Sequence, residues 1–178
     1  MKNSGGTPAC SPAFSVEVFD KAENAVATGI AGLLLRQFYR LKDGSGTLAA
    51  CVGPGELAMA AIRDLPADLV IDDVGRVLYR CTFWALEVEP AGDLSVTDLS
   101  RVPRDTGVAF TGSLVNGLDV ALGTPSVAVF SLNRAGRPLG VALSDSSVEV
   151  PPGGSWDFET DPVSDPGVEQ AAYPTSGP

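Results

Sequence analysis

The same order of strand and turn signals occurs twice in this chain of 178 residues. In each copy, an alternating apolar segment that opens with Ala-Phe precedes a strand ending in an aromatic-x-Leu pattern, a glycine turn and a Pro-Gly turn. The matching segments are residues 13–20, 39–44 and 54–55 in the first copy and residues 109–116, 130–136 and 152–153 in the second. Such self-similarity indicates copies of one structural unit. We therefore expect two copies of a small β-unit.

The distribution of turn residues predicts an all-β fold. The 20 Gly and 14 Pro are spread through the chain between short segments of alternating apolar and polar residues, as in proteins built from many short strands. Residues 76–88 form the clearest strand, and residues 43–46 (Asp-Gly-Ser-Gly) predict a hairpin turn with positive φ angles. Residues 25–41 are interpreted as two strands hinged near Gly29 or Gly32, with a helix over residues 27–38 as the alternative.

We expect five parts along the chain, with tandem immunoglobulin-like β-sandwiches, or one duplicated sandwich, between two extended arms. The parts are an arm (1–12), a first β-sandwich unit (13–92), a connector (93–106), a second β-sandwich unit (107–161) and an extended tail (162–178). The terminal segments lack apolar periodicity and are rich in Gly, Pro and Ser. Deleting residues 1–12 is therefore expected to leave the thermal midpoint nearly unchanged and to weaken assembly.

Four motifs in the second unit carry a resemblance to a known family. They are Phe110-Thr-Gly112-Ser-Leu114-Val-Asn116, Val127-Ala-Val129-Phe-Ser-Leu132, Gly136-Arg-Pro-Leu139-Gly140, and Val150-Pro-Pro152-Gly153 with Phe158 behind it. In this order they resemble the FxLYD-type β-sandwich, an immunoglobulin-like domain of many bacterial and archaeal surface proteins, and the first unit resembles it more loosely. The chain departs from the family where Asn133-Arg134 replaces Tyr-Asp. The resemblance implies an adhesive or structural role without catalysis.

The charge pattern bears on partners and location. A formal charge of −10 repels phosphate backbones and anionic lipid, so we expect no nucleic-acid partner. No run reaches the roughly 18 apolar residues of a membrane span, so we expect no membrane insertion. Residues 1–8 lack the apolar segment of a secretion signal. This predicts synthesis in the cytoplasm followed by residence in a virion or other assembly, or an extracytoplasmic location if Met1 is a cloning start.

The residue types limit the available chemistry. The chain has no histidine, which excludes Ser-His-Asp and Cys-His triads, and no glycine run has the frame of a phosphate loop. We therefore predict a protein that is not an enzyme, with no catalytic residues, no cofactor and no metal site. Carboxylates cluster at Asp72-Asp73, at Asp64/Asp68 and at Asp157-x-Glu159-x-Asp161. A cation is the alternative interpretation of the last cluster, and a solvated strand edge is the preferred one.

Cysteines and tryptophans are the remaining candidates for special roles. The three cysteines are Cys10, Cys51 and Cys81. We expect Cys51 and Cys81 to be buried thiols, with a disulfide or a catalytic thiol as alternatives. Trp84 is predicted to be a core residue of its strand, and Trp156, after a Gly-Gly turn, is predicted to be an exposed interface anchor.

These observations favour a non-enzymatic structural subunit of a larger assembly. A phage virion protein of the decoration, neck or tail type, or a filament component, fits a β-sandwich with flanking arms. Its partners would be proteins, in a homo-oligomer or a larger assembly. The alternative is an extracytoplasmic adhesion or ligand-binding module of a bacterial or archaeal surface protein, which the family resemblance supports.

Overall fold

Strands make up almost all regular structure in the computed structural model, which describes residues 2–31, 33–34, 37–60 and 71–176. Within these ranges the helical structure is the short 3-10 turn η1 (Ile71–Asp73). The predicted all-β fold is therefore confirmed. The helix considered for residues 27–38 does not form in its described part, which contains β2 (Ala25–Ala31), β3 (Leu33–Leu34) and the start of β4 (Gln37–Leu41).

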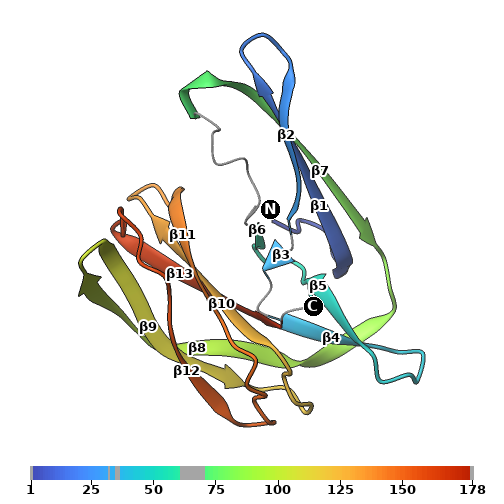
Figure 1. The fold of residues 1–178 in the computed structure, drawn as a ribbon. Coiled ribbons are helices and arrows are strands. Elements are labelled where there is room, and N and C mark those ends of the chain that lie inside the picture. Colours follow the sequence, from blue (N-terminus) through green and yellow to red (C-terminus); the bar gives the residue numbers. More distant parts are fainter. Residues whose placement is uncertain (1, 32, 35–36, 61–70, 177–178) are drawn as a thin grey trace.

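The largest sheet passes through both halves of the chain, and all its strand pairs are antiparallel. It begins at β12 and ends in a three-stranded part in which β1 lies between β2 and β7 (Figure 1). From that first strand to the three-stranded part, the spatial order is β12 (Ser155–Glu159), β9 (Gly107–Asn116), β8 (Val88–Arg104), β4, β5 (Leu48–Val52) and β1 (Ala9–Asp20). β7 (Val74–Trp84) pairs with β1.

A second sheet completes the sandwich. Its strands are β11 (Pro138–Asp145), β10 (Pro125–Leu132) and β13 (Glu169–Ser176), with β10 in the centre. Figure 1 shows this sheet facing β8, β9 and β12. The buried side chains of the main core come from both sheets and their connections: Phe38, Leu94, Phe110, Leu114, Leu118, Leu122, Val127, Val129, Ala142, Val150, Phe158 and Ala172. Burial of this apolar surface is the main source of stability.

Strand β10 is buried on both faces, which explains its nearly continuous apolar sequence. Val127 and Val129 point into the main core, whereas Ala128 and Phe130 belong to a second cluster with Tyr173 of β13. Met59, from the short strand β6 (Met59–Ala60) that pairs with β3, packs against this second cluster. The first half of the chain therefore contributes a side chain to the cluster on the outer face of this sheet.

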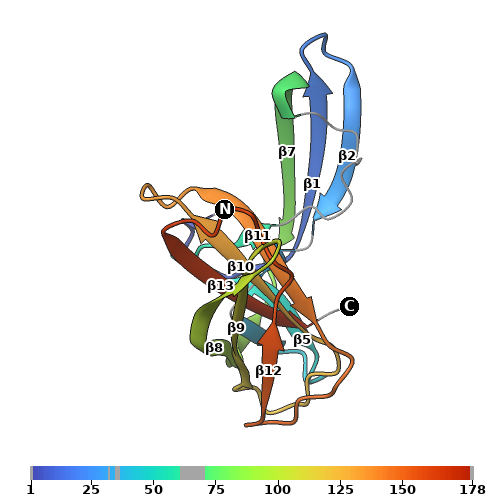
Figure 2. The same ribbon diagram turned by 60° about the vertical axis from the view of Figure 1, so that its left-hand side comes forward.

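Strands β1, β2 and β7 form a sheet that projects away from the sandwich (Figures 1 and 2). Val16 and Val18 of β1 are buried on one face, together with Ala27 of β2. The opposite face carries the ion pair between Glu17 of β1 and Arg80 of β7, next to Leu78. This alternation along β1 is the period-two pattern visible in the sequence.

The structure corrects the expected boundaries. Residues 93–106, expected to be a connector, lie largely within β8, which pairs with β4 at its start and β9 further along. In the described part of residues 13–92 the strands do not close a separate sandwich, since β4 and β5 belong to the sheet that covers the main core. The separation into two units fails because strand pairing joins residues distant in sequence.

Both terminal segments differ from the expected arms. In the first, Cys10 is fully buried in β1, and Lys2 bridges to Leu57. In the expected tail, all eight residues of β13 pair with β10. Pro174 lies within β13 and lacks an N–H, which an edge strand tolerates. A strand made of Glu-Gln-Ala-Ala-Tyr-Pro-Thr-Ser has little local β signal, and its long-range pairing with β10 decides its structure.

The hairpin turn predicted at residues 43–46 is confirmed. It joins β4 to β5, with φ angles of 79° at Gly44 and 73° at Gly46. The Asp43 carboxylate accepts hydrogen bonds from the backbone N–H of Ser45, at 2.8 Å, and from its side chain. The side-chain bond from Ser45 is the larger cause of a lowered pKa at Asp43.

Asn116 organises the loop that follows β9. It is fully buried, and its Nδ2 donates to the carbonyls of Val120 and Val150, both at 2.9 Å. Its Oδ1 accepts from the backbone N–H of Leu118 at 3.0 Å. This one side chain therefore satisfies three backbone groups that lie between the two sheets.

Replacing Asn116 is expected to destabilise the sandwich measurably. The Asn116→Ala variant should lose about 2–4 kcal/mol of unfolding free energy, because the buried N–H of Leu118 and the carbonyl of Val120 lose their hydrogen bonds to this side chain, while the Val150 carbonyl keeps its bond from Leu122. Denaturant unfolding followed by circular dichroism measures this loss. Asn133→Ala is the matched control: Asn133 Oδ1 accepts from Ala135 and Arg137 in an exposed turn, so a smaller change is expected. Equal losses in the two variants would contradict this role for Asn116.

Candidate functional site

The two tryptophans occupy environments that differ from those predicted. Trp84, predicted to be a core residue, is 55% exposed at the end of β7, so that prediction is wrong. Trp156, predicted to be an exposed anchor, is half-buried: it packs against the main core, with its ring centroid 5.9 Å from that of Phe158. Residue type alone does not distinguish these sites, because exposure depends on whether another layer covers the strand.

Exposed aromatic side chains gather along β7. Tyr79 is 61% exposed and Phe83 is 58% exposed, and Trp84 follows at the end of the strand. One side of β7 pairs with β1, and no strand within the described residues pairs with its other side. An exposed strand edge with large apolar side chains is a ready template for another chain. We call Arg76, Tyr79, Arg80, Phe83 and Trp84, with this open edge, the β7 edge surface.

The β7 edge surface also carries two arginines within an acidic protein. The sequence of β7 contains Arg76 and Arg80 and no acidic residue, whereas the whole chain carries a formal charge of −10. The Arg80 guanidinium lies 3.7 Å from Glu17, and that of Arg76 lies 3.9 Å from Glu23 and 4.4 Å from the centre of the Phe19 ring. Both arginines are at least half exposed. Such long, solvated ion pairs contribute little stability, so both guanidinium groups remain accessible.

The opposite end of the same sheet is acidic. β12 pairs with β9 on one side, and its other side has no partner strand in the described part of the chain. Asp157 and Glu159 are exposed on its outer face, while Trp156 and Phe158 face the core. Asp157 accepts a hydrogen bond from Ser113, and Glu159 forms a salt bridge of 2.6 Å with Arg104. We call Trp156, Asp157, Phe158 and Glu159, with this open edge, the β12 edge surface.

The acidic clusters do not form a metal site within the described residues, where no group of three or more potential ligand side chains is close enough to hold an ion. Asp157 and Glu159 are instead engaged by Ser113 and Arg104. The other clusters give no site either: Asp72 and Asp73 are exposed in η1, and Asp64 and Asp68 lie outside the described residues.

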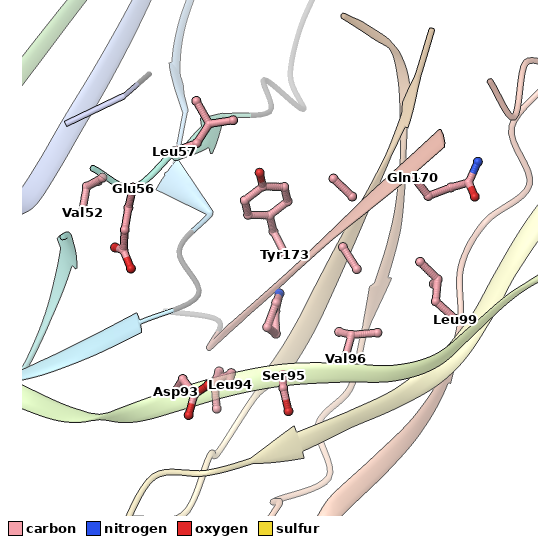
Figure 3. Close-up of a pocket in the computed structure, with 13 residues that line it drawn as sticks. Val52, Glu56, Leu57, Asp93, Leu94, Ser95, Val96, Leu99, Gln170 and Tyr173 are labelled. Carbon is pink, nitrogen blue, oxygen red and sulfur yellow. The ribbon is translucent and has the colours of Figure 1, made fainter. Parts of the chain in front are cut away.

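A groove of about 700 Å³ lies between β8, β13 and residues 52–57 (Figure 3). Val96 and Leu99 of β8 contribute apolar wall, and Leu57 stands 55% exposed on the other side. The Glu56 carboxylate is held by the backbone N–H of Gly53 at 2.6 Å. Nearby, burial raises the pKa of Tyr39, with a smaller contribution from the charge of Glu56. The groove therefore offers apolar walls with an acidic group at one end.

A disulfide joins the start of β1 to β5. Cys10 and Cys51 are direct partners in the β1–β5 register, and both are fully buried. The prediction of a buried thiol is therefore wrong for Cys51, while Cys81 is a half-buried thiol in β7. The sequence predicts an arm and not a strand at Cys10, and therefore does not predict this bond. The residues before position 13 show no alternation of apolar and polar side chains that would indicate a strand at Cys10.

Comparison with family models, with curated proteins and with solved structures gives no match to this chain. The resemblance of the second unit to FxLYD-type domains therefore stays a prediction. Among the described residues, no helix has the length and apolar character needed to cross a membrane.

Proposed function

We propose that this protein is a non-enzymatic structural subunit of a larger protein assembly, such as a virion or a filament, and that it acts through protein–protein contacts. The β7 edge surface is the observation that carries this proposal. It combines an open strand edge with three aromatic side chains that are each more than half exposed. Aromatic residues and arginine are the types enriched in protein interfaces.

The size of the exposed apolar area favours a contact over a chance arrangement. A Phe, Tyr or Trp side chain offers roughly 150–250 Å² of surface, so the three half-exposed rings leave about 300 Å² or more in water. At about 25 cal/mol per Å², covering them is worth several kcal/mol. Arg76 and Arg80 also fit a simpler role, in which charged side chains at an open strand edge prevent aggregation through that edge. That role alone does not explain why the rings beside them stay uncovered.

The disulfide and the groove favour a second candidate, an extracytoplasmic adhesion or ligand-binding module. Disulfides persist in oxidising environments and are rare in the cytosol, so the Cys10–Cys51 bond supports a working location outside the cytoplasm. The groove between β8 and β13 would hold the ligand of such a module. A subunit of an extracellular particle or surface filament satisfies the disulfide equally well, and the β7 edge surface makes it the stronger candidate.

Removing the aromatic side chains of β7 tests the proposed function. We expect the wild-type protein to self-associate with rising concentration in sedimentation velocity. The variant with Tyr79→Ser, Phe83→Ser and Trp84→Ser should stay monomeric, because the apolar area that drives the contact is gone. Leu139→Ser is the matched control: Leu139 is 47% exposed on β11, away from this surface, and its replacement should leave association unchanged. A monomeric wild-type protein at every concentration would overturn the proposal.

A further inference from the structure

We infer that the partner of the β7 edge surface is the β12 edge surface of a second copy of this chain, so that copies join head to tail through a continuous sheet. This inference rests on the proposed function and names its partner. The order of strands provides the first argument. β12 is the first strand of the large sheet, and β7 lies at its far end beside β1. Adding β12 of one copy to β7 of another would extend the same sheet by antiparallel pairing.

Charge complementarity selects these two edges. β7 itself contains two arginines and no acid, and β12 itself contains two carboxylates and no base; the intrachain ion pairs of these residues use partners from other segments of the chain. β2, which also has one strand partner among the described residues, has no charged residue in Ala25–Ala31. Complementary potentials bring partners together and reject wrong pairings. β7 is therefore a better partner than β2 for an acidic strand.

One antiparallel register matches both faces over the five residues of β12, which lie opposite residues 76–80 and leave Phe83 and Trp84 beyond the strand pairing. With Asp157 opposite Leu78, Glu159 lies opposite Arg76. Asp157 is then diagonal to both arginines, within the reach of long side chains. On the other face, this register places Trp156 opposite Tyr79. Like charges are avoided, and the half-buried tryptophan extends its apolar contact across the joint.

Pairing of β7 with β7 of another copy is less favourable. An antiparallel pair centred on Leu78 places Arg76 of one copy opposite Arg80 of the other. Like charges directly opposite each other are destabilising in a sheet. A contact between two different surfaces does not stop at two copies, because each added copy leaves one surface free for the next. Head-to-tail contacts produce a ring if the rotation closes and a filament if it does not, which agrees with a role in a larger assembly.

A charge swap between the two edges tests this inference on the full chain. The first variant carries Arg76→Glu and Arg80→Glu, and the second carries Asp157→Lys and Glu159→Lys. Each variant alone presents like charges at the joint, so its self-association should weaken by about a hundredfold. An equimolar mixture restores opposite charges at every joint and should assemble again. Sedimentation velocity measures each protein and the mixture, and thermal unfolding confirms that each is folded.

The second variant loses the Glu159–Arg104 salt bridge, so a milder pair guards against misfolding. Asp157→Asn with Glu159→Gln keeps hydrogen-bonding groups and should weaken association about tenfold. Assembly of the mixture but not of its components supports the inference. If the wild type associates through the β7 aromatics while the β12 variants have no effect, the head-to-tail joint is wrong and the proposed function stands. A wild type that remains monomeric overturns both.

Discussion

A chain that ends at Val168, before β13, is expected to lose its cooperative fold. All eight residues of β13 pair with β10. Its Ala172 belongs to the main core, and its Tyr173 packs edge-on to Phe130 with ring centroids 5.7 Å apart. Loss of a buried aromatic side chain alone costs about 3–5 kcal/mol, and the truncation also exposes the backbone of the central strand. Domains are stable by only about 5–15 kcal/mol in total.

Near-ultraviolet circular dichroism and thermal unfolding measure this effect. A chain ending at Ser176 keeps β13 and should unfold like the full chain, which controls for the removal of terminal residues as such. Tyr173→Ala should give an intermediate result, with a folded protein that is less stable by about 3–5 kcal/mol. If the chain ending at Val168 unfolds at the same temperature as the full protein, the segment is a tail after all.

Loss of the Cys10–Cys51 disulfide should lower the unfolding free energy by about 4 kcal/mol, because the bond closes a long loop in the unfolded chain. The cysteines are separated by 41 positions. The variant with Cys10→Ser and Cys51→Ser, measured by denaturant unfolding, should match the wild type after reduction. Deleting residues 1–12 should have a similar effect, since the deletion removes Cys10. The structure thus reverses the expectation that this deletion leaves the thermal midpoint unchanged.

Cys81→Ser is the control for this prediction. Cys81 lies half-buried in β7 outside the disulfide, so its replacement should change the free energy much less. The reductant should also have little effect on the variant that lacks Cys10 and Cys51. A wild-type protein whose stability does not respond to reduction would show that the bond does not form in solution.

Much of the sandwich was predictable from local patterns. The alternating segment at residues 109–116 lies within β9, and residues 76–84 of the strand expected at 76–88 lie within β7. Their alternating side chains and flanking turns are properties of neighbouring residues, which the sequence displays directly. The same holds for the glycine turn between β4 and β5.

The candidate site was predictable only in part. The residue type and the preceding turn of Trp156 indicate an interface residue, and it lies in β12, within the proposed contact. The β7 strand was also expected, but the exposure of its aromatic residues was not, since an apolar strand usually has a second layer over it. The missing element of the prediction was the projection of the β2–β1–β7 sheet away from the sandwich (Figure 2).

Sequence alone determined that this protein is all-β, where most of its strands lie and which chemistry its side chains lack. These properties depend on residue type and on periods of a few positions. The tertiary structure decided that β13 is a strand and not a tail, that Cys10 meets Cys51, and that Trp84 is exposed while Trp156 is half-buried. Each of these features depends on contacts between residues distant along the chain, because the strand that packs beside a residue determines its hydrogen-bond partners and its burial.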